Sequence, residues 1–273
     1  MTRPALRRTV TDNGLITVKT MLNQTQTRLN IAVLGAPLVI AALVIAAPAQ
    51  GAIALDRTRV IFDGDQKTVS LNISNQNKQL PYLAQGWIED EQGNKIQSPF
   101  TVLPPVQRVD PGKPSQVKIQ ALPAAKLLPQ DRETLYYFNL REIPPRSNKP
   151  NTLQIALQTR IKMFYRPAAV APQKNAAPSQ QSLTLTRQGD KYVVNNPTPY
   201  YVTLVDGAAR KGGKSVAGFE PVMVAPKGSA PLGVSASAIG SAPVLTYIND
   251  YGGRPQLVFR CTGNLCLTVA DKQ

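Results

Sequence analysis

The sequence predicts an all-β protein of two domains, the first of them an immunoglobulin-like β-sandwich. Short stretches of alternating apolar and polar residues recur along the chain, as expected for strands with one buried face. Turn signals such as Asp63-Gly64-Asp65 separate these stretches. No helical periodicity of useful length, glycine-rich phosphate loop or repeat of fixed period is visible. The first domain shows about seven short strands, a count typical of an immunoglobulin-like sandwich, and the second domain is also all-β.

The first 51 residues read as a secretory signal peptide. Residues 31–47 form an apolar run without a charge, Arg28 precedes the run, and small residues lead to Gly51. We therefore expect cleavage before Ala52. The alternative is a membrane anchor, because 17 apolar residues reach the lower end of a spanning helix. Either Met1 or Met21 fits as the start of the chain.

The mature chain is expected to hold two domains, 52–167 and 168–273. Residues 168–180 are rich in Ala, Pro, Gln, Ser and Asn, which indicates a linker or a loop that leads into the second domain. The strands expected before it are 55–62, 69–74, 82–89, 117–120, 135–143 and a strand that starts at 151. Those expected after it are 183–185, 192–194, 201–205, 222–224, 244–248, 257–261 and 266–269.

The net charge and the absence of histidine limit the classes of function that suit this chain. Residues 1–51 contain 5 of the 31 basic and 1 of the 16 acidic residues, so 26 basic and 15 acidic residues remain, a net charge of +11. Such a charge suits an acidic protein partner or an anionic membrane surface, and export makes nucleic acid an unsuitable partner. Dispersed, solvated charge is the alternative. The absence of histidine excludes a His-dependent triad and the common zinc sites.

Catalysis, metals and cofactors are therefore not expected. Glu89, Asp90 and Glu91 could be imagined as an acid/base pair, but they lie at a turn beside Gly93, where solvation is their expected role. Cys261 and Cys266 are the two cysteines of the chain. In an oxidising compartment they should form a disulfide across a hairpin, and the loop-entropy model gives so small a ring only about 2 kcal/mol.

The stretch 151–167 is the most distinctive segment. Leu153, Ile155 and Leu157 alternate with Gln and Ala, so a strand would place these three aliphatics on one face. Prolines at 144, 145 and 150 precede it, which favours a strand at the margin of a sheet, open to a partner. The alternative is that the three side chains line the core of their own sandwich.

Long motifs resemble a known family, the periplasmic chaperones of the chaperone–usher pathway, of the PapD-like, P-pilus type. They are LDRTRVIFDG, SNQNKQLPYLAQGWIED, PPVQRVDPG, LPQDRETLYYFNLREIPPRS, LQIALQTRIKMFYRP, NPTPYYVTL and YINDYGGRP. The resemblance runs from about residue 52 to 266. It implies two immunoglobulin-like domains arranged in an L, with an interdomain cleft that anchors the C-terminus of a pilus subunit. The short loop at 144–150 resembles the short-loop subgroup.

The resemblance also implies roles for particular residues. The donor strand, which fills the place of the subunit's missing strand, would carry Leu153, Ile155 and Leu157. Arg59 and Lys162 match the two basic residues that bind the subunit's terminal carboxylate, although read alone they are ordinary cations. Glu133, Arg166 and Asp250 match a set of interdomain salt bridges, whose alternative is surface pairing worth about 0–1 kcal/mol each. Lys162 has the opposite parity from the donor residues, which requires a cation on the other face or a twist between them.

The function implied is a periplasmic chaperone that binds, folds and caps pilus subunits by donor-strand complementation and delivers them to the outer-membrane usher. Its partners would be pilus subunits and the usher, with self-capping as a dimer when no subunit is bound. No nucleic acid, no cofactor and no stable membrane insertion after signal cleavage are expected. The alternative is an exported immunoglobulin-like adhesin or carbohydrate-binding module, but Tyr136-Tyr137 and Tyr200-Tyr201 are adjacent pairs that would point to opposite faces.

Overall fold

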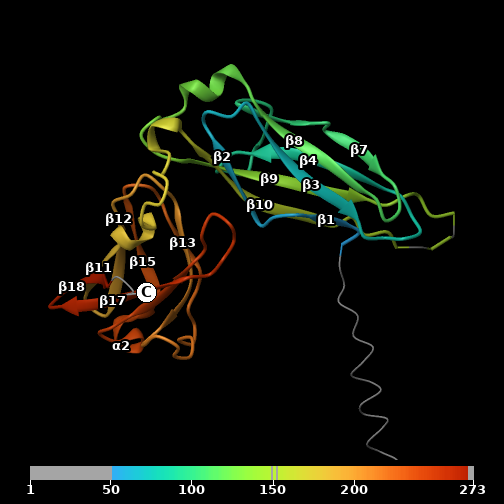
Figure 1. Cartoon of the computed structure of the whole chain (residues 1–273). Coiled ribbons are helices and arrows are strands. Elements are labelled where there is room, and N and C mark those ends of the chain that lie inside the picture. The colour runs from blue at the N-terminus through green and yellow to red at the C-terminus, as the bar shows by residue number, and fades with distance from the viewer. Residues whose placement is uncertain (1–50, 149, 152, 270–273) are drawn as a thin grey trace, which may run out of the picture. The chain divides into compact units, whose positions relative to one another are not determined.

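The computed structural model describes residues 51–148, 150–151 and 153–269, so the predicted signal lies outside the described residues except for Gly51. The all-β prediction is confirmed (Figure 1). Helical structure in the described ranges is limited to short segments, which are η1 (Pro123–Leu127), η2 (Ala168–Val170), η3 (Ser179–Ser182) and α2 (Ala236–Ile239).

The strands up to residue 166 form two sheets. The first has the order β1 (Ile53–Leu55), β3 (Thr68–Asn75), β8 (Pro114–Ala121) and β6 (Phe100–Leu103). The second has the order β2 (Arg59–Asp63), β10 (Gln158–Arg166), β9 (Thr134–Ile143), β4 (Tyr82–Glu89) and β5 (Lys95–Ile96), and β7 (Val106–Val109) also pairs with β4. The ladders are antiparallel except for β10 with β2, which is parallel.

Buried side chains from both sheets form one core. The predicted alternation in β3 is confirmed, because Val69, Leu71 and Ile73 are buried and the residues between them face outward. Phe100 lies at the centre of an aromatic cluster, with its ring centroid 5.0 Å from Phe62 and 5.1 Å from Tyr136. This face-to-face burial defines a sandwich.

The predicted single strand over 55–62 is wrong in one respect. The chain forms β1 in the first sheet, leaves it after Leu55 and enters the second sheet as β2 at Arg59. Asp56 fixes the crossing, since its backbone N–H donates to Asn72 O (3.1 Å) and its carboxylate accepts from Asn72 N (3.2 Å). The crossing brings Arg59 beside β10.

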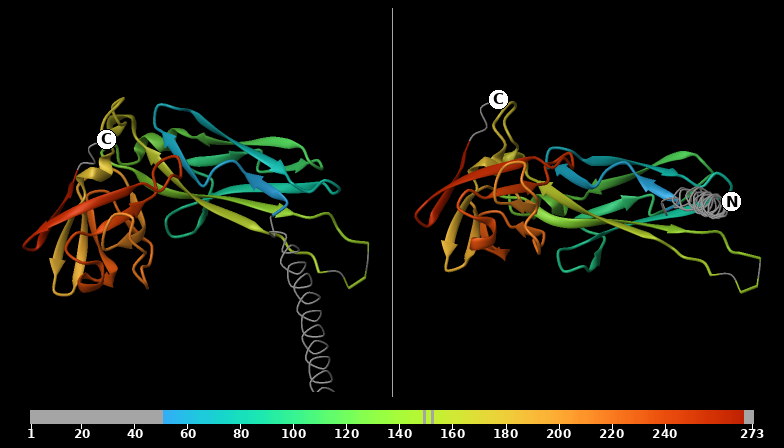
Figure 2. Two further views of the ribbon diagram at one scale, coloured as in Figure 1. Left: turned by 60° about the horizontal axis from the view of Figure 1, so that its bottom comes forward. Right: turned by 90° about the horizontal axis from the view of Figure 1, so that it is seen from below.

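The strand predicted from residue 151 starts later, at Gln158. The described residues among 144–157 belong to no strand, and the connection from β9 to β10 extends beyond the ends of both sheets (Figure 2). Alternation of apolar residues is therefore not sufficient to form a strand here, because strand structure also needs a hydrogen-bonding neighbour.

The strands from residue 184 onward form a separate sheet system. Its order is β14 (Val222–Val224), β13 (Val202–Ala208), β16 (Val244–Tyr247), β17 (Gln256–Thr262), β18 (Leu265–Val269), β11 (Thr184–Gln188), β12 (Lys191–Asn196) and β15 (Gly228–Ser235). A second hydrophobic core lies within it. The sheets divide between β10 and β11, on either side of the predicted 167/168 boundary, which stays a prediction.

Sequence patterns missed several strands. β15 is GSAPLGVS, in which only Leu232 and Val234 are fully buried, and small residues hide the alternation. It is the last strand in the order, where Pro231 costs no central ladder hydrogen bond. The strands β5, β6 and β7 contain only 2, 4 and 4 residues, which is too short for alternation to be recognised in the sequence.

The predicted disulfide is confirmed. Cys261 and Cys266 are bonded across the β17–β18 hairpin. Gly263 at its turn has φ of 60°, a left-handed conformation that glycine adopts without strain.

Replacing Phe100 by alanine should destabilise the protein by about 3–5 kcal/mol, because the ring is fully buried among aromatic neighbours. Urea unfolding measures the change. Leu127→Ala is the matched control, since Leu127 is 87% exposed, and its effect should stay within about 0.5 kcal/mol. Equal effects of the two substitutions would contradict the described core.

Candidate binding site

Arg59 and Lys162 lie side by side although 103 positions separate them in the sequence. They are direct partners in the parallel β2–β10 pairing, where Lys162 is in register with Arg59. The two cations that sequence analysis selected from opposite ends of a domain therefore share one site.

Arg59 and Lys162 both donate to uncharged oxygen atoms of the second domain. Arg59 is 9% exposed, its Nη1 donates to the backbone oxygen of Ile248 at 3.3 Å, and its buried Nε has no hydrogen-bond partner in the described part of the chain. Lys162 Nζ donates to Thr203 Oγ1 at 3.3 Å. No ion pair involving either side chain forms among the described residues, so the site holds two poorly compensated positive charges.

Their electrostatics favour an anion. Burial lowers the pKa of Arg59, an effect that the charges of Asp250 and Glu133 oppose. Burial also lowers the pKa of Lys162, and the charge of Arg59 beside it adds to the shift. An anion bound between them would remove the repulsion and supply the missing acceptors, since hydrogen bonds between charged groups are the strongest available.

β10 presents two different faces. Ile161, Met163 and Tyr165 belong to the core of the sandwich. Lys162 and Phe164 alternate with them and point the other way, and the Phe164 ring lies 5.5 Å from that of Tyr201 in the second domain. Lys162 therefore lies on the face of β10 opposite its core residues, and the choice between opposite faces and a twist relative to the donor residues stays a prediction.

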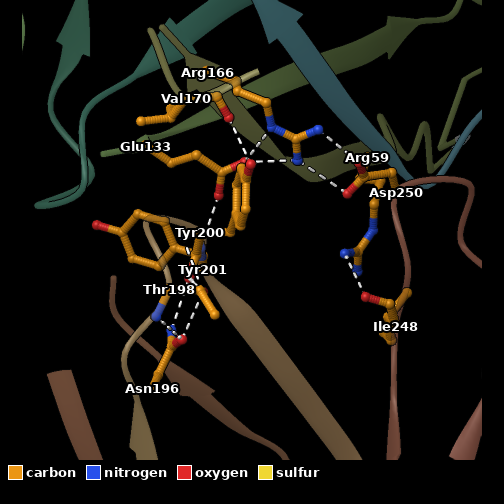
Figure 3. A network of polar contacts seen from close by, with 10 residues as sticks. All are labelled: Arg59, Glu133, Arg166, Val170, Asn196, Thr198, Tyr200, Tyr201, Ile248 and Asp250. Atoms are coloured by element: carbon orange, nitrogen blue, oxygen red, sulfur yellow. Dashed lines mark hydrogen bonds and ion pairs between the residues drawn. The ribbon is translucent and has the colours of Figure 1, made fainter. Parts of the chain in front are cut away.

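Arg166 forms ion pairs with both Glu133 and Asp250 (Figure 3). Arg166 contacts Glu133 Oε1 at 2.7 Å through Nη2 and Asp250 Oδ2 at 2.7 Å through Nη1. Glu133 Oε2 also accepts from the Tyr201 N–H at 2.8 Å. The side chains of Arg166 and Glu133 are only 7% and 1% exposed, so the surface-pairing alternative is wrong for this pair.

The contacts between Arg166 and the two carboxylates stabilise the charged forms of these side chains. Burial alone would lower the pKa of Arg166, but the hydrogen bonds and charges of Asp250 and Glu133 outweigh it and raise that pKa above the usual arginine range. Burial raises the pKa of Glu133, which the charge of Arg166 and the Tyr201 N–H oppose. The network joins the residue that precedes β9, the end of β10 and the loop after β16.

A polar turn positions the second domain's side of this network. Asn196 Nδ2 donates to Tyr200 O at 2.7 Å, and Thr198 Oγ1 donates to Asn196 Oδ1 at 2.7 Å (Figure 3). Tyr200 in turn donates from its hydroxyl to Val170 O at 2.6 Å, and the Arg166 guanidinium lies 4.9 Å from its ring centroid. The turn thereby holds the Tyr201 N–H against Glu133.

The three predicted donor residues are exposed. Leu153 is 84% exposed, Ile155 62% and Leu157 48%, so the alternative that they line the core of their own domain is wrong. Leu157 stays close to the sandwich, because its carbonyl accepts from the Glu142 N–H at 2.9 Å. The row of aliphatics leads directly into β10.

One edge of β10 is paired for only part of its length. β2 pairs with it from Lys162 to Arg166, and on that side residues 158–161 have no strand neighbour among the described residues. This vacancy exists because the chain is still crossing between sheets at residues 56–58. Backbone groups along the unpaired part are available to another strand.

The carboxylates considered for catalysis have structural partners. Glu89 accepts from Trp87 Nε1 at 2.9 Å and from Arg160 Nε at 2.8 Å, and Asp90 accepts from Asn94 N at 2.8 Å. Burial would raise the pKa of Glu89, but the hydrogen bonds from Arg160 and Trp87 hold it below its usual value. A general acid needs the opposite shift.

Thr203 and Ile248 are site residues that sequence analysis missed. Thr203 accepts from Lys162 through its hydroxyl, and Ile248 accepts from Arg59 through its backbone oxygen. Neither residue type signals a role by itself. Their signal in the sequence is membership in the motifs NPTPYYVTL and YINDYGGRP, which carry the family resemblance.

Comparison with known proteins identifies the family. Residues 52–171 match the family model described as pili and flagellar-assembly chaperone, PapD N-terminal domain. Residues 178–259 match the pili assembly chaperone PapD, C-terminal domain. The chain belongs to the PapD family of pilus-assembly chaperones. The family expected from the sequence motifs is thereby confirmed.

Individual members of the PapD family are closely similar. The chain is 56% identical over 211 residues to the probable fimbrial chaperone YfcS of Escherichia coli strain K12, covering 77% of this chain and 83% of that protein. It is 50% identical over 225 residues to the chaperone protein PapD of Escherichia coli, covering 82% and 92%.

Solved chaperone structures have the same fold. The periplasmic chaperone SfaE matches with a TM-score of 0.60 and 33% identity, over 76% of this chain and 98% of that one. The chaperone SafB, solved in complex with the SafA pilin of Salmonella enterica, matches with a TM-score of 0.63 and 28% identity, over 78% and 98%. In the described residues of the present chain, no helix is long and apolar enough to cross a bilayer.

Arg166→Leu should destabilise the protein by about 3–5 kcal/mol, because Glu133 would remain as a buried charge without its partner. Thermal or urea unfolding measures the loss. Lys227→Ala is the matched control, since Lys227 forms an ion pair with Asp131 at 2.6 Å in which both side chains are about half exposed. That control should cost at most about 1 kcal/mol, and a similar loss from both would contradict the special role of burial.

Proposed function

We propose that this PapD-family chaperone binds pilus subunits by lending them a strand and anchoring their terminal carboxylate, and delivers them for fimbrial assembly. The observation that supports this most is the unpaired edge of β10. It continues the exposed row of Leu153, Ile155 and Leu157 and ends at the buried Arg59 and the half-buried Lys162, neither of which forms an ion pair within the described residues. These three features do not stabilise the isolated chain, whereas each of them can contact a bound partner strand.

The direction of the bound strand follows from the sheet. β2 runs parallel to β10 and starts at Arg59, so a partner strand in the vacant position would lie in line with β2, end to end. If it also runs parallel to β10, its C-terminus points at Arg59 and Lys162. The terminal carboxylate then replaces the acceptors that these cations lack, and β-strand addition supplies the backbone hydrogen bonds.

The exposed row would supply packing to the partner. Alternate side chains on a strand lie about 7 Å apart on one face, so Leu153, Ile155 and Leu157 can enter successive pockets of an incomplete sandwich. We propose that they stand in for the core of the missing strand. When no subunit is bound, two copies would cover these rows mutually, as a self-capping dimer.

The remaining parts of the proposal concern the cellular compartment of the protein and the class of protein to which it belongs. The protein acts in the periplasm after signal cleavage, passes its subunits to an outer-membrane usher and catalyses no reaction. The disulfide supports an oxidising compartment. The tyrosine pairs give no support to a sugar-binding module, since Tyr136 packs in the core and Tyr137 lies under Arg160 on the opposite face.

Ile155→Glu should leave the isolated chaperone folded and abolish capture of its pilus subunit. The side chain is 62% exposed, so the unfolding free energy should change by no more than about 0.5 kcal/mol. In the complex the new charge would be buried without a partner, which costs several kcal/mol. Melting curves and copurification of a co-expressed subunit measure the two effects.

Leu127→Glu is the control for the donor test, because Leu127 is exposed in η1, outside the row. It should retain capture. Retained capture by Ile155→Glu, or unfolding of the free variant, would refute the donor role.

Arg59→Ala and Lys162→Ala should each weaken binding of a peptide that copies a subunit's C-terminus. Loss of one partner of a buried carboxylate costs about 2–5 kcal/mol, or roughly thirtyfold to several-thousandfold in affinity. Amidation of the peptide should cause a similar loss in the unmodified chaperone. Calorimetric titration with both peptides measures the affinities.

Arg210→Ala/Lys214→Ala is the control, because these exposed cations lie on a loop of the second domain. If general basicity were responsible, this pair would weaken binding as much as Arg59→Ala, and moderate salt would remove it. That result, or indifference to amidation, would exclude the carboxylate anchor.

A further inference from the structure

Glu142 is a buried carboxylate outside the site described above. It lies near the end of β9 and is 6% exposed. One of its oxygens, Oε2, accepts from the backbone N–H of Ile53 at 2.8 Å. No lysine or arginine in the described ranges forms an ion pair with it. A carboxylate removed from water costs free energy unless a cation or several donors compensate it.

The carboxylate oxygen lies beside residue 52. A Cβ built on Gly51 would be 3.2 Å from Glu142 Oε2, and Ile53 N on the other side of Ala52 is 2.8 Å from the same atom. Ala52 itself is held in place, because its carbonyl accepts from Gln76 N at 2.6 Å. The oxygen is therefore close to both ends of the one residue that the predicted cleavage makes the first of the mature chain.

We propose that Glu142 is the binding site for the α-ammonium group of the mature N-terminus. Hydrolysis of the Gly51–Ala52 peptide bond adds one water, leaving a carboxylate on the released signal and an amine on Ala52. That amine binds a proton at neutral pH. The proposal rests on the export and cleavage proposed above, and it identifies a partner charge that the precursor, with an amide nitrogen at this position, does not have.

The ion pair would act on the donor row. The backbone N–H of Glu142 donates to Leu157 O at 2.9 Å, and a Cβ on Gly51 would lie 3.5 Å from Leu157 Cδ1. Residue 52, Glu142 and the last residue of the exposed row therefore share one small cluster. Signal cleavage then stabilises the point at which the row joins its domain, so that processing completes the binding edge.

The test removes the positive charge without changing any side chain. The exported protein is first checked by intact mass for a start at Ala52. Treatment with pyridoxal phosphate then transaminates the N-terminal alanine to a neutral ketone. The same treatment is applied to Glu142→Gln. The four proteins form a double-mutant cycle, in which the N-terminus is an amine or a ketone and residue 142 carries a carboxylate or an amide.

Transamination should raise the unfolding equilibrium constant about tenfold in the protein with Glu142, and by less than twofold in Glu142→Gln. Equal effects in the two proteins, or no effect with Glu142 present, would overturn the proposal. Amide hydrogen exchange gives a second readout that needs no variant. Ile53 should exchange faster after transamination while Val194, in the second domain's core, stays unchanged, and an unchanged Ile53 would also overturn it.

Failure of this inference can be distinguished from failure of the proposed function. A mass that shows a different N-terminus contradicts the cleavage site, and failure to bind a carboxylate-ended peptide contradicts the anchor. An intact start at Ala52, normal peptide binding and no coupling to Glu142 would contradict this inference alone.

Discussion

The organisation of this molecule depends on one unmet requirement for backbone hydrogen bonds, along the outer edge of β10. A strand inside a sheet has two neighbours, and β10 has β9 along its length but β2 only from residue 162 onward. The vacancy arises locally, because Asp56 keeps the chain with β3 until it crosses to the second sheet. Had β1 and β2 formed one strand, as their sequence suggests, that strand would have covered the edge and left nothing to offer a partner.

Charge is distributed unequally along the outward face of the same two strands. Arg166 has two carboxylates within 2.7 Å, whereas among the described residues Arg59 donates to a carbonyl oxygen and Lys162 to a hydroxyl. The difference separates two roles. Arg166, whose charge is matched by two carboxylates, connects the domains, while Arg59 and Lys162 retain charge and hydrogen-bonding capacity for an anion.

Sequence patterns predicted the parts of the fold that local chemistry determines. β3 shows its buried face through Val69, Leu71 and Ile73, and the cysteine hairpin follows from two cysteines five positions apart. Patterns failed where tertiary context decides. Leu153, Ile155 and Leu157 alternate as strand residues do, yet no neighbour exists to make them a strand. β15 is a strand although its small residues hide the alternation, and Thr203 contacts Lys162 only because the domains meet there.

The opposite parity of the cations and the aliphatic row has a mechanical consequence under the proposed binding mode. If the row became a continuation of β10 on binding, it would share the parity of the core residues Ile161 and Met163, so a partner strand beside it would extend the sandwich layer, while Lys162 lies on the outer face. A uniform edge accepts a partner strand in several registers, and a slip of one residue turns every side chain to the wrong face. A chain has only one terminal carboxylate. Fixing that group at Arg59 and Lys162 therefore selects a single register, which aligns the three aliphatics with the pockets they have to fill.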